Sequence, residues 1–123
     1  MGVNMRVLII DANEDYKNIY SRKFEKLGNI KFDFNTSLTE EILKSLCFAK
    51  PDVILVNHYH KNVNGMEIYD LLRKWGYLGK IIITTAGKAN RISRFRYNGI
   101  AGILDKSAQD DDFVKEFKSL AEL

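Results

Sequence analysis

The chain has 123 residues, a length typical of one domain with a single core, so residues 1–123 are expected to form one folded unit. Hydrophobic residues make up 46% and charged residues 28% of the sequence, which excludes a disordered or collagen-like chain. The net charge of +3 is too small to indicate nucleic-acid binding. Cys47 is the single cysteine and no long apolar run predicts a membrane span or leader, so we expect a cytoplasmic protein.

Five short apolar runs of strand length recur along the chain, at residues 7–10, 30–34, 53–56, 81–83 and 100–104. The second run alternates between apolar and polar residues, which is typical of an edge strand with one exposed face. The first and third runs are continuously apolar. This pattern predicts central strands that are buried on both faces.

Segments with the apolar spacing of helices separate these runs. The first is expected to use Asn13 as its N-cap and to end at Gly28. The second follows Ser37, which could form a capping box with Glu40, and it must end before Pro51. Three further helices are predicted around residues 68–75, 89–95 and 113–120.

Strict alternation of strands and helices predicts a parallel sheet with right-handed crossovers and helices on both faces. The edge and central strands give the order 2-1-3-4-5, a flavodoxin-like, doubly wound (βα)5 three-layer α/β sandwich. In such sheets ligands bind beyond the carboxyl ends of the strands. The residues directly after the runs are therefore the candidate site residues; they are Asp11, Asn57, Thr84, Thr85, Asp105 and Lys106.

Several short stretches in the right order resemble the receiver domain of bacterial two-component response regulators, from residue 6 to residue 120. They are Val-Leu-Ile-Ile-Asp at 7–11, Pro-Asp-Val-Ile-Leu-Val at 51–56, Asn-Gly-Met-Glu at 64–67, Thr-Ala at 85–86 and Gly-Ile-Leu-Asp-Lys at 102–106. No single stretch is specific, but the ordered set is. The resemblance implies a signalling module and not an enzyme.

The resemblance also implies a site for phosphoryl transfer. In that family two acids after the first strand and an aspartate after the third hold Mg²⁺, and the latter accepts the phosphoryl group, while a hydroxyl and a lysine contact its oxygens. Thr85 and Lys106 match the last two positions, and Asp11 matches the first acid. The second acid is replaced by Ala12 and the acceptor by Asn57, whose amide is no nucleophile. We therefore expect a degenerate pseudo-receiver without catalytic residues, metal or cofactor.

Further departures from the family occur in the same region. Lys61 and Ser107 stand where the family usually has prolines, Asn64 where it has an aspartate, and Ile103 where it has the aromatic residue that reports phosphorylation. The family's cis peptide before the second proline is expected to be lost. Because so many positions differ together, natural degeneration is favoured over one engineered inactivating substitution at Asn57.

The missing acids and a basic segment lead to two contact predictions. Lys106 faces no acceptor aspartate, so it is expected to approach Asp11 or to donate to the Asn57 carbonyl oxygen. Residues 88–98 hold four basic residues and no acid. In the family the fourth helix, fifth strand and fifth helix bind partners or dimerise, so Arg91 and Arg94 are candidate contacts to a protein partner or a second copy, with no role for nucleic acid or membrane.

Three alternatives stay open at this point. The chain could be a working phosphoreceiver with an unusual acceptor or metal arrangement. His58 and His60 could bind a metal or carry a phosphoryl group, although the favoured interpretation is that both are loop residues that face water. A small-ligand domain of the nucleotide or flavin kind is disfavoured, because the turn at 11–15 is acidic and would repel phosphate.

Overall fold

A computed structural model describes residues 5–37, 39–58, 65–86 and 99–122. Five parallel strands form one sheet in the order β2-β1-β3-β4-β5, as predicted. The strands are β1 (Met5–Ile10), β2 (Ile30–Asn35), β3 (Val53–Asn57), β4 (Lys80–Thr85) and β5 (Gly102–Asp105). The described helices are α1 (Tyr16–Glu25), α2 (Glu40–Phe48), α3 (Gly65–Lys74) and α4 (Asp110–Ala121).

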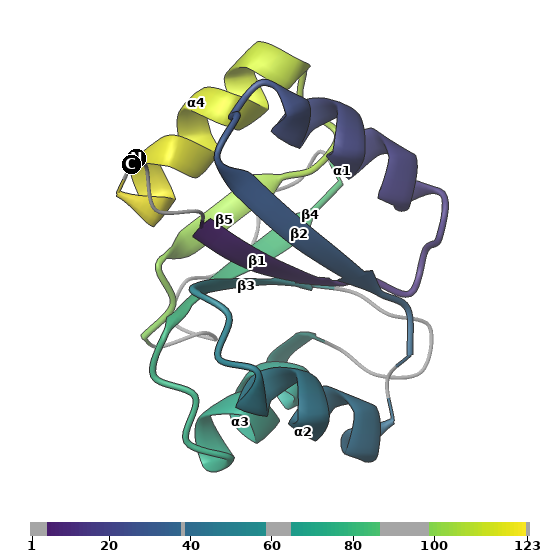
Figure 1. Cartoon of the computed structure of the whole chain (residues 1–123), viewed down its shortest axis with the longest axis vertical. Coiled ribbons are helices and arrows are strands. Elements are labelled where there is room, and N and C mark those ends of the chain that lie inside the picture. The colour runs from purple at the N-terminus through teal and green to yellow at the C-terminus, as the bar shows by residue number, and fades with distance from the viewer. Residues whose placement is uncertain (1–4, 38, 59–64, 87–98, 123) are drawn as a thin grey trace.

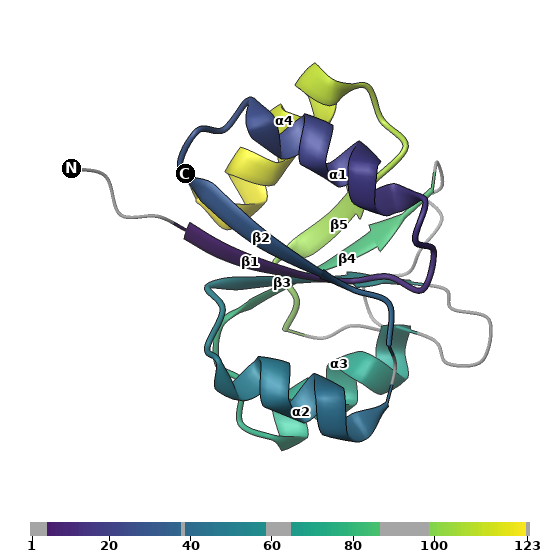
Figure 2. The same ribbon diagram turned by 45° about the vertical axis from the view of Figure 1, so that its right-hand side comes forward.

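Helices cover both faces of the sheet and make three layers (Figure 1, Figure 2). Helices α1 and α4 lie on one face, and α2 and α3 lie on the other. Each interface has its own core, because alternate strand residues point to opposite faces: Ile9 and Leu55 pack beneath α1 and α4, whereas Leu8 and Ile54 pack beneath α2 and α3. The predicted flavodoxin-like fold is confirmed. The helix predicted at 89–95 lies outside the described residues.

Burial along the strands follows the sequence pattern. Every residue of β3 is buried, whereas β2 exposes Lys31 and Asp33 at the edge of the sheet. The parallel register pairs Ile10 with Val56, which brings the carboxyl ends of the central strands to one edge of the sheet. This alignment places the residues that follow the strands close together.

Helix starts differ from the sequence expectation. The N-cap of α1 is Asp15, because Asn13 forms a local turn in which its Oδ1 accepts the Asp15 N–H at 3.0 Å. The N-cap of α2 is Thr39, so the prediction of a capping box between Ser37 and Glu40 is wrong. The Ser37 hydroxyl instead lies 3.3 Å from the Thr39 hydroxyl. Three acids, Asp110, Asp111 and Asp112, lie in the first turn of α4 and interact favourably with its helix dipole.

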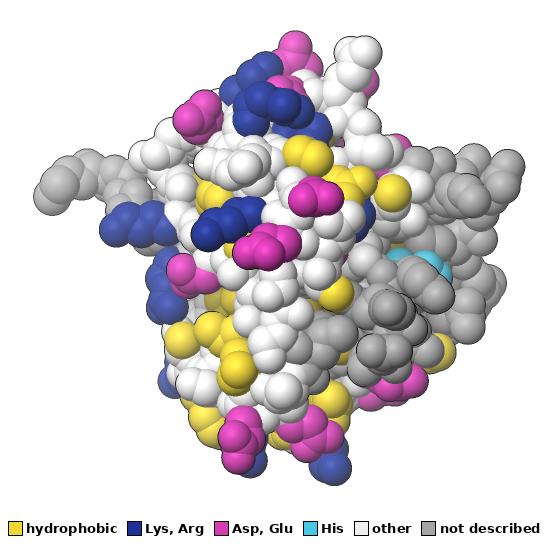
Figure 3. All heavy atoms as spheres, turned by 90° about the vertical axis from the view of Figure 1, so that its right-hand side faces the viewer, with side chains coloured by type: hydrophobic (Ala, Val, Ile, Leu, Met, Phe, Trp, Pro, Cys, Tyr) yellow, Lys and Arg dark blue, Asp and Glu magenta, His cyan; other side chains and the backbone are white. Residues whose placement is uncertain are grey.

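Charge is distributed evenly over the visible surface. On the face shown in Figure 3, acidic and basic side chains are interspersed and form no large patch of one sign. Within the described residues, no helix has the length and apolar character that crossing a membrane requires.

Candidate functional site

The ends of three neighbouring strands bring most of the predicted site residues together. Asn57 pairs with Thr84 across β3 and β4, and Thr85 pairs with Asp105 across β4 and β5. A backbone hydrogen bond extends the pairing of β4 with β5 by one residue: the Lys106 N–H donates to the Thr85 carbonyl at 2.8 Å. The buried polar residues at this edge form what we term the carboxyl-end cluster; they are Asp11, Asn57, Thr84, Thr85 and Lys106.

A buried ion pair is the centre of the carboxyl-end cluster. Lys106 Nζ lies 2.6 Å from Asp11 Oδ2, and the two side chains are 5% and 0% exposed. The other carboxylate oxygen of Asp11 accepts the Asn13 N–H at 2.9 Å. The expected approach of Lys106 to Asp11 is confirmed. Because charged groups are stable in a protein interior only when paired and hydrogen-bonded, each partner requires the other.

Tyr16, which the sequence did not single out, closes one side of this ion pair. Its ring centroid lies 3.8 Å from Lys106 Nζ, within the range of a cation–π interaction. Burial and the nearby carboxylates of Asp11 and Asp105 raise the pKa of Tyr16, so the ring stays neutral and can face an ammonium. Tyr16 fits the apolar spacing of α1. Its place in the first helical turn after Asp11 is the signal that could have identified it.

Asn57 ends β3 in tight contact with the start of α3. Gly65 N–H donates to the His58 carbonyl at 2.8 Å, and a Cβ at position 65 would lie only 2.5 Å from the Asn57 carbonyl oxygen. Only a glycine permits this approach. The glycine of the Asn-Gly-Met-Glu stretch therefore fixes the backbone beside Asn57.

Two neighbouring hydroxyls are buried on the α1 side of the cluster, that of Thr84 within it and that of Tyr20 beside it. Tyr20 and Thr84 lie beside one another, but among the described residues neither hydroxyl has a hydrogen bond of normal geometry. Burial raises the pKa of Tyr20 far above its ordinary value. Tyr20 therefore remains protonated, and this pair adds no charge to the cluster. Thr85, the hydroxyl that matches the family position, is also buried.

The residues of the cluster do not fit a magnesium ion. Mg²⁺ requires several oxygen ligands and prefers carboxylates. Asp11 supplies one carboxylate, already paired with Lys106, while Ala12 supplies none and Asn57 only a neutral amide. The carboxylate of Asp105 accepts hydrogen bonds from Ser107. In the part of the chain that the structure describes, no group of three His, Cys, Asp or Glu residues could hold a metal.

Some predicted site residues cannot be placed. Arg91, Arg94, Lys61, Asn64 and His60 lie outside the described residues. His58 is half-buried at the end of β3. Ile103 is half-buried on β5, and a hollow of about 420 Å³ lies between β5 and α4. The peptide between Lys106 and Ser107 is trans, as the loss of the proline predicts.

Comparisons with known proteins identify the family and agree with the fold. The family model of the response regulator receiver domain matches residues 7–118. A LuxR-family two-component response regulator from Aurantimonas sp. SI85-9A1 superposes with a TM-score of 0.80 at 17% identity, over 97% of this chain and 86% of that one. The signal receiver domain of the response regulator NarL from Mycobacterium tuberculosis superposes with a TM-score of 0.76 at 18% identity, over 98% of both chains. The receiver domain of the Francisella response regulator 1452 superposes with a TM-score of 0.76 at 22% identity, over 97% of this chain and 98% of that one. No curated protein matches the chain.

Proposed function

Since this chain belongs to the response regulator receiver domain family, we propose that it is a two-component signalling module that acts through protein contacts and accepts no phosphoryl group at Asn57. The observation that carries this proposal is the ion pair of Lys106 with Asp11. The lysine is held against the remaining acid of the motif, beside an amide where the family has its acceptor.

The weak nucleophilicity of the Asn57 amide is the first support for the proposal. The amide nitrogen of Asn57 has a delocalised lone pair, and its carbonyl oxygen is far less nucleophilic than a carboxylate. Asp11 is the one carboxylate in the carboxyl-end cluster, and it is fully buried and engaged by Lys106 and the Asn13 N–H. An incoming phosphodonor would have to displace these partners before it reached an oxygen of Asp11.

Charge balance supports the proposal as well. The Lys106 ammonium neutralises the Asp11 carboxylate directly, so a divalent cation would have to compete with an internal partner at 2.6 Å. Mg²⁺ gives up its water ligands reluctantly and needs more than one carboxylate to compensate. The cluster is therefore a neutral, metal-independent structural unit.

We place the contact surface on β5 and the C-terminal helix, α4, which corresponds to the fifth helix predicted from the sequence. The hollow between them includes Ile103 together with the charged residues Asp112 and Lys115. Such a mixture of apolar and charged side chains suits a protein interface. Arg91 and Arg94, which precede β5, are the proposed basic contacts to a protein partner or a second copy.

One experiment tests the chemistry and another tests the surface. Incubation with Mg²⁺ and acetyl phosphate, followed by intact-mass analysis, should leave the mass unchanged; a stoichiometric phosphoryl adduct at any residue would support a working phosphoreceiver instead. For a self-associating protein, Arg91→Glu with Arg94→Glu should weaken association in sedimentation velocity, most strongly at low salt. An unchanged profile would exclude the proposed surface.

A further inference from the structure

Two exposed apolar side chains, those of Phe48 and Leu78, lie together at the end of the molecule opposite the carboxyl-end cluster. Among the described residues, three large hydrophobic side chains are exposed: Ile42 at 43%, Phe48 at 63% and Leu78 at 93%. Two belong to α2, and Leu78 belongs to the connection between α3 and β4. Exposed apolar residues that occur together, rather than singly, are typical of an interaction site.

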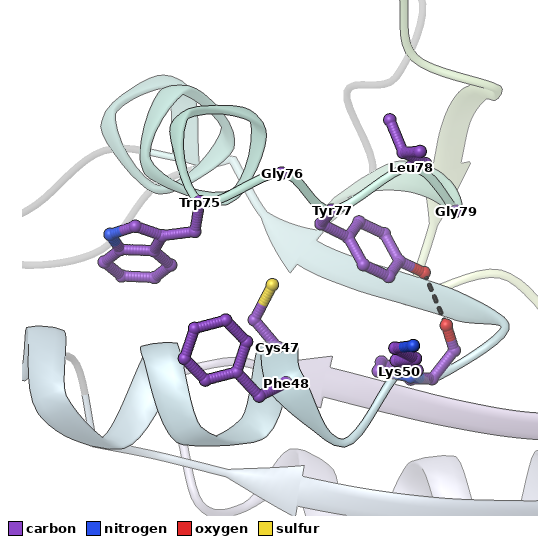
Figure 4. A pocket seen from close by; sticks show the side chains of 9 residues that line it. Cys47, Phe48, Lys50, Trp75, Gly76, Tyr77, Leu78 and Gly79 are labelled. Atoms are coloured by element: carbon purple, nitrogen blue, oxygen red, sulfur yellow. Dashed lines mark hydrogen bonds between the residues drawn. The ribbon is translucent and has the colours of Figure 1, made fainter.

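A cavity of about 440 Å³ lies between these elements. Phe48 from α2 and Trp75, directly after α3, face its interior, with Cys47 to one side of them, and Leu78 points away at the rim (Figure 4). Burial raises the pKa of the Cys47 thiol, so this wall is neutral. We call this cavity the amino-end pocket; the residues that define it are Cys47, Phe48, Lys50, Trp75, Tyr77 and Leu78.

The walls of the amino-end pocket are held by internal hydrogen bonds. The Tyr77 hydroxyl donates to the Pro51 carbonyl at 2.9 Å, which ties the α3–β4 connection to the residue before β3. Arg73 Nη1 donates to the carbonyls of Tyr77 at 2.7 Å and Gly79 at 3.1 Å. A preorganised site loses little conformational entropy when it binds a ligand.

Among the described residues that line the pocket, Lys50 is the one that carries a charge. Lys50 lines it in a left-handed backbone conformation with φ of 54°, and its ammonium has no ion pair or hydrogen bond with any described residue. Lys44 Nζ lies 6.0 Å from the Phe48 ring centroid, in a neighbouring hollow that Glu41 also lines. Among the described residues, no acid lines the amino-end pocket itself.

We propose that the amino-end pocket binds a peptide segment of a protein partner. One aromatic or large aliphatic side chain of the segment inserts between Phe48 and Trp75, and neighbouring Asp or Glu carboxylates face Lys44 and Lys50. Apolar insertion supplies the affinity, and charge complementarity selects the partner. A small ligand would fill the cavity but leave Leu78 uncovered, so a peptide fits the surface better. This surface is separate from Asn57 and from the β5–α4 hollow, and it does not depend on the proposed function.

Selection from a random peptide library, with the Phe48→Ser variant used for counter-selection, tests the proposal. Phe48 is largely exposed, so the variant should keep its core. We expect the enriched peptides to combine a large apolar residue with adjacent acids. Titration of one such peptide should change the fluorescence of Trp75, the single tryptophan. Affinity should fall by more than about tenfold in Phe48→Ser.

The Lys50→Gly variant tests what the Lys50 ammonium contributes to peptide binding without disturbing the fold. Glycine favours the left-handed backbone at this position, so the variant removes the ammonium without strain, and peptide affinity should fall roughly fivefold. Lys31→Ser, on the exposed edge of β2, is the matched control and should bind as the parent does. The proposal is overturned if no enriched peptide distinguishes the parent from Phe48→Ser, or if Lys50→Gly binds equally well. Self-association that Phe48→Ser abolishes would overturn it in favour of a second copy.

Discussion

Lys106 and Asp11 form a buried ion pair at 2.6 Å, although 95 residues separate them in the sequence. The pair brings together the two charged residues of the carboxyl-end cluster. Tyr16 covers the ammonium and excludes water from one side. The charges at the carboxyl ends of the strands thus balance within the chain itself.

Removal of one partner should leave the other charged and buried. We expect Asp11→Ala to lower the free energy of unfolding by about 3 kcal/mol, measured by urea denaturation at neutral pH. The double variant Asp11→Ala with Lys106→Met removes both charges and should recover part of that loss. A double variant no more stable than the single one would show that the pair contributes nothing through its charge.

Reversion of the missing acids should make stability depend on magnesium. Ala12→Asp with Asn57→Asp places three carboxylates around Lys106, and each like-charge pair costs on the order of 1 to 4 kcal/mol, depending on the effective dielectric. The double revertant should therefore melt below the parent without metal, and millimolar Mg²⁺ should restore it. The parent should show no such dependence. Stabilisation of the parent by Mg²⁺ would contradict the assignment of a metal-independent cluster.

Gly65 should tolerate no side chain. An added Cβ would meet the Asn57 carbonyl oxygen at 2.5 Å and the His58 Cα at 3.0 Å, both of them backbone atoms that cannot rotate away. We expect Gly65→Ala to lower the free energy of unfolding by about 1 to 3 kcal/mol. Gly28→Ala is an instructive comparison, because Gly28 has open space but a φ of +54°. In Gly28→Ala, the decrease in the free energy of unfolding should come from backbone strain alone.

Asp110 should make stability depend on pH in the acid range. Hydrogen bonds from Lys23, first, and from Arg22 hold the pKa of Asp110 below its ordinary 3.8 in the folded protein. Its stabilising contribution is therefore complete above the unfolded pKa and is lost as the pH falls through the folded pKa. The difference in Tm between the parent and Asp110→Asn should be present at pH 7 and vanish in strong acid. Asp112→Asn, on the same helical turn, is the comparison, and it should lower the Tm at pH 7 less than Asp110→Asn does, because Asp112 has no ion pair with any described residue.

The fold and the ion pair could be predicted from the sequence because their determinants are local or few. Continuous apolar runs identified β1 and β3 as central, and the alternation around Phe32 identified β2 as an edge. The rule that sites lie beyond the carboxyl ends of parallel strands then selected Asp11 and Lys106. With one acid of the motif left, the partner of the lysine was restricted to that acid or the Asn57 carbonyl oxygen.

Contacts between distant segments could not be predicted in the same way. Tyr16 has the spacing of a core residue, and only the angle at which α1 crosses the sheet places its ring over Lys106. Phe48 and Trp75 line one cavity because two helices end side by side, which no periodicity records. The N-cap of α2 shifted to Thr39 because several polar residues in one loop can each begin a helix.

The ion pair also has a consequence for the order of folding. β1 and β5 are not neighbours in the sheet, since β3 and β4 lie between them. Lys106 can therefore reach Asp11 only after all four strands have aligned, so the contact should be absent from the folding transition state. Interactions of this kind slow unfolding without accelerating folding. Asp11→Ala should raise the unfolding rate in stopped-flow experiments while the refolding rate stays almost unchanged, which would make the ion pair a determinant of how long the native state persists.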